Sequence, residues 1–343
     1  MTPVRPAVDP ELTALLADLP LGVGLDADLL PVMRQFAVTP PEEALRNHAV
    51  TRHDHAAVAP DGTAIPLTVL TPADHVPGDH LPADLPPTGG APCVYWIHGG
   101  GMVMGDRFSQ IGIPLDWLAE FGAVVVSVEY RLAPEATGTT AVEDCHHGLL
   151  WVAEHAAELG VDPARIVVAG VSAGGGLAAG AALLARDRGT PPLAAQVLVC
   201  PMLDHRNSTV SSAQFTGTPG VWTGEMNAFG WQSLLGGLDP AEVPAYVSPA
   251  LAADLSGLPP TYIDAGSAEV FRDEDVAYAA GIWAAGGSAE LHVWDGGFHG
   301  FDALFPEARL SVAARRTRSA WLARTLSASP VPPGPLDPAA VRD

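Results

Sequence analysis

The sequence predicts an α/β fold with a mostly parallel central sheet flanked by helices. Short apolar runs alternate with helical patterns along most of the chain, and this alternation is typical of a parallel sheet covered on both faces. Hydrophobic residues make up 48% of the 343 residues and charged residues only 16%, which suits a large buried core. We therefore expect one globular domain with added segments.

The first part of the chain, residues 1–45, shows short helical patterns broken by prolines. Leu12, Leu15, Leu16 and Leu19 form one apolar stripe there. A β-hairpin follows at a sheet edge, because two alternating segments at 52–58 and 64–70 are separated by a turn sequence, P-D-G. Further strands are predicted at 93–97, 123–128, 165–169, 195–200, 261–265 and 290–294, and helices at 110–120, 141–159, 174–186, 273–285 and 306–326.

The alternation lapses between residues 201 and 255, in a segment rich in aromatic residues. We interpret this segment as a cap insertion. The predicted organisation is therefore N-terminal cap helices (1–45), a first part of the core (46–200), the cap insertion (201–255), a second part of the core (256–326) and a proline-rich flexible tail (327–343). A further exposed loop is expected at 72–91, which is rich in proline, aspartate and histidine.

The sequence G-V-S-A-G at residues 170–174 is the strongest local signal. It directly follows the predicted strand 165–169 and opens the predicted helix 174–186. A nucleophile elbow needs small residues on both sides of its serine, because the strained turn brings their backbones together. We predict that Ser172 is a nucleophile, whereas the structural alternative is a glycine-rich helix entry packed on its strand.

A glycine run, H-G-G-G at residues 98–101, ends the predicted strand 93–97. Consecutive glycines let backbone N–H groups approach one point, which suits an oxyanion that forms in a transition state. A nucleotide-binding loop is disfavoured, because neither glycine run has the G-x-G-x-x-G spacing and the chain contains no G-K-[ST].

Together these motifs resemble the hormone-sensitive-lipase-like family of α/β-hydrolases, which are bacterial esterases. The resemblance extends through E-Y-R-L-A-P-E at 129–135, F-R-D-E at 271–274 and H-G-F at 299–301. It implies an α/β-hydrolase fold with a helical cap, Ser172 as nucleophile and His299 as general base. It also implies oxyanion donors at Ala173 and within the run Gly99, Gly100 and Gly101, of which the last two are favoured.

The triad acid is assigned by the same resemblance. The family has an aspartate three residues before Arg-Asp-Glu, and the matching residue here is Glu269. Asp273 is the alternative. The chain order Ser172, Glu269, His299 is the order of this fold, and glutamate can orient an imidazole as aspartate does.

We expect a serine carboxylesterase that hydrolyses short to medium acyl esters through an acyl-enzyme. Hydrolysis of another acyl bond (amide, lactone or carbamate) and a non-catalytic, ligand-binding role remain alternatives. Apolar side chains from the glycine run and the cap insertion are the candidates for the substrate pocket: Met102, Phe215, Trp222 and Trp231.

The net charge of −22 disfavours nucleic acids and anionic membranes as partners. The expected partner is a small-molecule ester, without a metal or an organic cofactor. The three cysteines lack metal or disulfide spacing, and no secretory pattern is recognised at the N-terminus, so a cytoplasmic location is expected. The oligomeric state is left open, with a homodimer among the alternatives.

Overall fold

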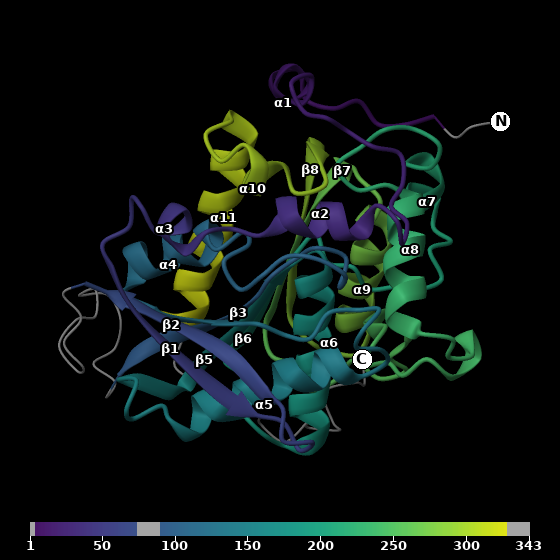
Figure 1. Cartoon of the computed structure of the whole chain (residues 1–343). Coiled ribbons are helices and arrows are strands. Elements are labelled where there is room, and N and C mark those ends of the chain that lie inside the picture. The colour runs from purple at the N-terminus through teal and green to yellow at the C-terminus, as the bar shows by residue number, and fades with distance from the viewer. Residues whose placement is uncertain (1–3, 74–89, 328–343) are drawn as a thin grey trace, which may run out of the picture.

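The fold is built on one eight-stranded sheet with the strand order β1-β2-β4-β3-β5-β6-β7-β8 (Figure 1). The computed structural model describes residues 4–73 and 90–327. The hairpin β1–β2 and the pair β2–β4 are antiparallel, and all other pairs are parallel. The strands are β1 (Val50–Val58), β2 (Ala64–Pro72), β3 (Ala91–Ile97), β4 (Val124–Val128), β5 (Val161–Val171), β6 (Ala195–Val199), β7 (Thr261–Ala268) and β8 (Ala289–Phe298).

Helices cover both faces of the sheet, as the unbroken apolar strands require. Successive side chains of β3 show the two faces: Tyr95 belongs to the core cluster of one face and Trp96 to that of the other. The first cluster includes residues of α5 (Thr140–Glu154), α6 (Ala173–Arg188) and α9 (Arg272–Ala284), and the second includes residues of α4 (Gly112–Phe121) and α11 (Arg309–Ser327). The predicted fold class is therefore confirmed.

Short helices from two distant parts of the chain lie outside these layers (Figure 1). They are α1 (Pro10–Leu16), α2 (Leu30–Ala37) and α3 (Pro41–Ala44) near the N-terminus, and α7 (Val210–Gln214), α8 (Gly224–Leu235) and the 3₁₀ turns Pro240–Glu242 and Pro249–Leu251 in the predicted insertion. The two parts contact each other directly. Gly220 donates its N–H to the carbonyl of Gly22 over 3.0 Å, and Arg5 donates to the carbonyl of Thr216.

The predicted stripe of four leucines in the N-terminal part is wrong. Helix α1 ends at Leu16, so Leu19 is not part of it. Leu12 is fully buried against Phe298 and Phe301, and Leu16 packs at the edge of that cluster, whereas Leu15 is exposed. Only residues four apart on this short helix face the core.

Two predictions lie mostly outside the described residues. These are the exposed loop, of which residues 74–89 are not described, and the tail, of which residues 328–343 are not described. Within residues 4–73 and 90–327, none of the helices combines the length and the hydropathy needed to cross a bilayer.

A buried arginine joins α11 to the end of the sheet. Arg318, which is 1% exposed, donates to both carboxylate oxygens of Asp264 in β7 and to Asp302 over 3.0 Å. Asp302 lies in α10 (Phe301–Leu304), directly after the loop that carries His299. Removal of one member of such a group leaves unpaired charge in the core. This lowers the free energy of unfolding by far more than the intact group contributes to it.

We predict that Arg318→Met lowers the free energy of unfolding by about 3 to 5 kcal/mol, because two carboxylates lose their buried partner. Urea unfolding followed by circular dichroism measures the loss. The matched control is Arg324→Met on the same helix, where the exposed pair with Glu290 contributes at most about 1 kcal/mol. Equal losses in the two variants would contradict this prediction.

Candidate active site

Ser172 lies in the sharp turn between β5 and α6. Its backbone has φ 57° and ψ −123°, a conformation that is strained for a residue with a side chain. The turn closes because its neighbours are glycines: a Cβ on Gly170 would collide with the backbone of Gly174. The structure therefore has the nucleophile elbow that the sequence predicts, with Ser172 at its tip.

His299 follows β8 directly and reaches the elbow from the neighbouring strand ends. Its Nε2 lies 2.9 Å from Oγ of Ser172, and its Nδ1 lies 2.6 Å from Oε2 of Glu269. A neutral imidazole that donates from Nδ1 to the carboxylate leaves Nε2 free to accept the serine proton. The ring is also held from the side, because Phe271 packs edge-on at 5.1 Å between ring centroids.

The structure brings Glu269, and not Asp273, to His299. Glu269 immediately follows β7 and is 1% exposed. Asp273 instead accepts the N–H of Ser211 over 2.8 Å and the Nε–H of Arg272. Burial raises the pKa of Asp273, but these hydrogen bonds outweigh it, so the pKa lies below its ordinary value. Asp273 therefore ties the start of α7 to α9.

Two further acids, Glu274 and Asp275, are buried in α9, a few residues after Glu269. Burial raises the pKa of both well above the ordinary value, and the nearby charge of Glu269 adds to the effect on Asp275. Both side chains are thereby driven toward the neutral, protonated form.

The glycine run lies against the nucleophile, but it does not offer three equivalent donors. A Cβ on Gly99 would be 3.3 Å from Cβ of Ser172. The N–H of Gly99 already donates to Oε1 of Gln110 over 3.0 Å, so its assignment as an oxyanion donor is wrong. Within residues 4–73 and 90–327, no protein acceptor takes the N–H of Gly100, Gly101 or Ala173, and these three remain the candidate donors.

The four candidate pocket residues occupy different places. The indole of Trp222 covers Gly101, where a Cβ would collide with it, and its ring lies 6.4 Å from that of His299. Met102 is buried, with its side chain directed to the first turn of α6.

The other two aromatic candidates have different neighbours. Phe215 packs under the guanidinium of Arg5. Trp231 is buried with its ring 6.2 Å from that of His205. Of the three predicted pocket aromatics, Trp222 is therefore the one that the described residues place beside the imidazole.

Cys200 is a neighbour of Glu269 and His299 that was not predicted from the sequence. Its Sγ, a carboxylate oxygen of Glu269 and a ring nitrogen of His299 lie within 4.8 Å of one another. Burial raises the pKa of the Cys200 thiol well above its ordinary value, so the group is a neutral thiol rather than a competing nucleophile. Its position directly after β6, at the same sheet edge as the other site residues, is the signal that could have identified it.

Comparison with known proteins places this geometry in a family. Residues 94–303 match the family described as the alpha/beta hydrolase fold. The chain is 35% identical over 298 residues to Esterase LipI of Mycobacterium tuberculosis, covering 87% of this chain and 88% of that one. It is 37% identical over 301 residues to Carboxylesterase NlhH of the same organism, covering 84% and 87%.

Solved structures agree with this assignment. The chain superposes on a bacterial heroin esterase with a TM-score of 0.83 and 37% identity, over 94% of this chain and 99% of that one. An esterase from Pyrobaculum calidifontis gives a TM-score of 0.80 at 30% identity, over 94% and 100%. The chain belongs to the hormone-sensitive-lipase-like family of α/β-hydrolases, and the predicted resemblance is confirmed.

The two candidate acids can be separated by mutation. We predict that Glu269→Gln lowers kcat by about 10³-fold or more, because an amide neither fixes the imidazole tautomer nor balances its charge. Asp273→Asn keeps the imidazole partner and should lower kcat by less than about tenfold. Steady-state kinetics on p-nitrophenyl butyrate decide between them, and a reversed ranking would assign the acid to Asp273.

Proposed function

We propose that Ser172 attacks the carbonyl carbon of an ester while His299 accepts its proton and Glu269 holds the imidazole. The observation that carries this proposal is the unbroken chain of contacts, 2.9 Å from Oγ to Nε2 and 2.6 Å from Nδ1 to Oε2. Attack forms a tetrahedral oxyanion, whose collapse expels the alcohol after His299 returns the proton to it. Water then attacks the acyl-enzyme by the same route and releases the acid.

The oxyanion is received by the N–H groups of Gly100, Gly101 and Ala173. Ala173 is the first residue of α6, so its N–H has no partner inside the helix and lies at the positive end of the helix dipole. Loss of one such donor costs roughly 3 to 4 kcal/mol of transition-state stabilisation in comparable sites. Because the donors are main-chain groups, the backbone conformation determines where the oxyanion hole lies and how its N–H groups point.

The protein is a carboxylic ester hydrolase that acts on small ester substrates, as the esterases to which it is similar indicate. The finer assignment to short and medium acyl chains is part of our proposal. It is supported by Trp222, whose indole covers Gly101 and lies with its ring centroid 6.4 Å from that of His299.

The division into core and cap belongs to the same proposal. We assign residues 1–45 and 201–255 to a cap, because the two segments contact each other through Arg5, Gly22 and Thr223. The hydroxyl of Thr223, next to Trp222, donates to the carbonyl of Val23. A seated cap excludes water from the oxyanion site and strengthens the electrostatic interactions there.

Ser172→Ala tests the nucleophile. We predict that kcat on p-nitrophenyl butyrate falls by about 10⁶-fold, because removal of the nucleophile leaves only binding and the oxyanion donors. The fold should be unchanged, as circular dichroism can verify. Ser327→Ala, at the exposed end of α11, is the control and should keep full activity. A Ser172→Ala enzyme with wild-type turnover would remove Ser172 from the mechanism.

Trp222→Ala tests the wall of the acyl pocket. We predict that the ratio of kcat/KM on octanoate to that on acetate p-nitrophenyl esters rises by about tenfold, because space opens for added methylenes. Trp283→Ala is the matched control, since Trp283 is 48% exposed on α9. If both variants keep the wild-type ratio, Trp222 does not limit chain length.

A further inference from the structure

The loop of residues 102–110, here called the oxyanion loop, follows the glycine run directly. Its backbone orients one of the proposed donors. The carbonyl of Gly100 accepts the N–H groups of Val103 and Met104 over 3.1 and 3.0 Å. Because the carbonyl of Gly100 and the N–H of Gly101 belong to one planar trans peptide, they point in opposite directions. The loop that holds the Gly100 carbonyl therefore fixes the direction of the Gly101 N–H.

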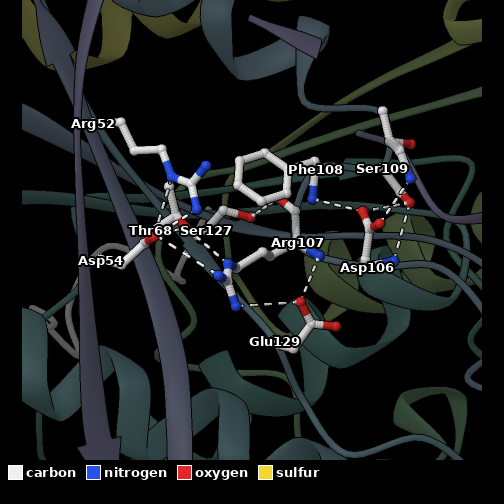
Figure 2. Close-up of polar contacts among 10 residues, drawn as sticks. Arg52, Asp54, Thr68, Asp106, Arg107, Phe108, Ser109, Ser127 and Glu129 are labelled. Atoms are coloured by element: carbon white, nitrogen blue, oxygen red, sulfur yellow. Dashed lines mark hydrogen bonds and ion pairs between the residues drawn. The ribbon is translucent and has the colours of Figure 1, made fainter. Parts of the chain in front are cut away.

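One side of the oxyanion loop is anchored to the antiparallel edge of the sheet. Figure 2 shows Arg107 between Thr68 of β2 and Glu129, which follows β4. Arg107 donates its Nε–H to Oγ1 of Thr68 over 2.8 Å and its main-chain N–H to Oε2 of Glu129 over 3.1 Å. Its carbonyl accepts the hydroxyl of Ser127 over 2.7 Å. These contacts tie the loop to the core of the protein.

The other side is anchored to cap helix α2 by Arg34. Its Nε–H donates to the carbonyl of Val103 over 2.7 Å, and its Nη2 donates to the carbonyl of Ala133 over 2.8 Å. The carboxylate of Glu135 accepts from both terminal nitrogens over 2.7 Å. Arg34 thus joins the oxyanion loop to residues 133–135, and the N–H of Ala133 donates to the carbonyl of Met102 over 2.9 Å.

Two further contacts involve the last residue of α2 and the segment that follows it. The hydroxyl of Ser109 donates to the carbonyl of Ala37 over 3.2 Å, and the N–H of Thr39 donates to Asp106 over 2.7 Å. The chain segment 34–39 therefore follows the oxyanion loop over most of its length. Among these contacts, the one from Arg34 lies nearest in sequence to Gly101.

We propose that Arg34 is a positioning residue for the oxyanion hole. By binding the Val103 carbonyl to α2 of the cap, it keeps the Gly101 N–H pointing toward the oxyanion. This inference rests on the proposed roles of Ser172, Gly100 and Gly101. The cap then has a second function in addition to shaping the pocket. When α2 is packed against the core, the oxyanion loop is held by Arg34 on one side and by the contacts of Arg107 on the other. The hydrogen-bond partners of Arg34 are Val103, Ala133 and Glu135 and not the side chains of the proposed triad, so Arg34 acts through the peptide between Gly100 and Gly101.

The test compares a transition-state analogue with its ground-state counterpart. Oγ of Ser172 adds to the carbonyl carbon of a trifluoromethyl ketone, and the adduct is a tetrahedral oxyanion. The methyl ketone of the same chain length binds without forming that charge. The variants are Arg34→Ala and Arg34→Lys. Glu135→Gln removes the exposed carboxylate partner but leaves both carbonyl contacts. Arg309→Ala removes the ion pair between α11 and Glu11 of α1, in which the Arg309 side chain is 88% exposed. Melting temperature is measured for each.

For Arg34→Ala we expect kcat to fall by about 10- to 100-fold, since small displacements of catalytic groups have effects of this size. Affinity for the trifluoromethyl ketone should fall by the same factor, with KM and methyl ketone affinity unchanged within about twofold. Arg34→Lys should be intermediate, because an ammonium lacks the planar fork that reaches two carbonyls. Glu135→Gln and Arg309→Ala should stay near wild type, because exposed ion pairs contribute little.

The positioning role is overturned if Arg34→Ala weakens both ketones equally, or if the two control variants lose as much kcat as Arg34→Ala. Ser172→Ala, tested in parallel, distinguishes failure of the Arg34 positioning role from failure of the proposed mechanism at Ser172. If the trifluoromethyl ketone needs Ser172 but is insensitive to Arg34, the positioning role alone fails. If it binds Ser172→Ala as tightly as wild type, the proposed mechanism fails.

Discussion

The contact between His299 and its two partners is the constraint on which the rest of the structure depends. A proton can pass from Ser172 to the imidazole only if three side chains from separate parts of the chain meet within hydrogen-bonding distance. The parallel sheet meets this requirement, because β5, β7 and β8 end at the same edge and each is followed at once by one member of the triad. The buried pairing of Arg318 with Asp264 and Asp302 holds the segment after His299 against the same sheet.

The second constraint concerns the backbone around the nucleophile. Ser172 is held at φ 57°, and the surrounding glycines permit the close approach of β5, α6 and the run at 99–101. Since the proposed oxyanion donors are main-chain N–H groups, their directions follow from peptide planes and not from side-chain rotamers. This is why contacts at a distance, such as that of Arg34 with Val103, bear on the chemistry.

Much of the fold and part of the site can be predicted from the sequence, for a physical reason. Strands buried on both faces are continuous apolar runs, and the elbow needs glycines at fixed spacing around Ser172, so both leave local signals. Glu269 was predicted from its position in the family motif, and in the structure its carboxylate contacts Nδ1 of His299.

What the sequence could not predict depends on contacts between distant segments. The donor role assigned to Gly99 failed because Gln110, eleven residues away, takes its N–H, and no spacing rule indicates that bond. The stripe predicted at Leu12, Leu15, Leu16 and Leu19 failed because α1 ends at Leu16 and Leu15 lies on its exposed face. Arg34 had no local signal, since its function comes from two carbonyls that lie about 70 and 100 residues further along the chain.

The central claim is that one serine attacks while three main-chain N–H groups receive the oxyanion. A crystal structure of the enzyme inactivated with diethyl p-nitrophenyl phosphate tests it most directly. The account predicts phosphorus bonded to Oγ of Ser172, with the phosphoryl oxygen about 2.7 to 3.1 Å from the N–H groups of Gly100, Gly101 and Ala173. Phosphorus on another residue, or a phosphoryl oxygen directed to solvent away from these three groups, would contradict the account.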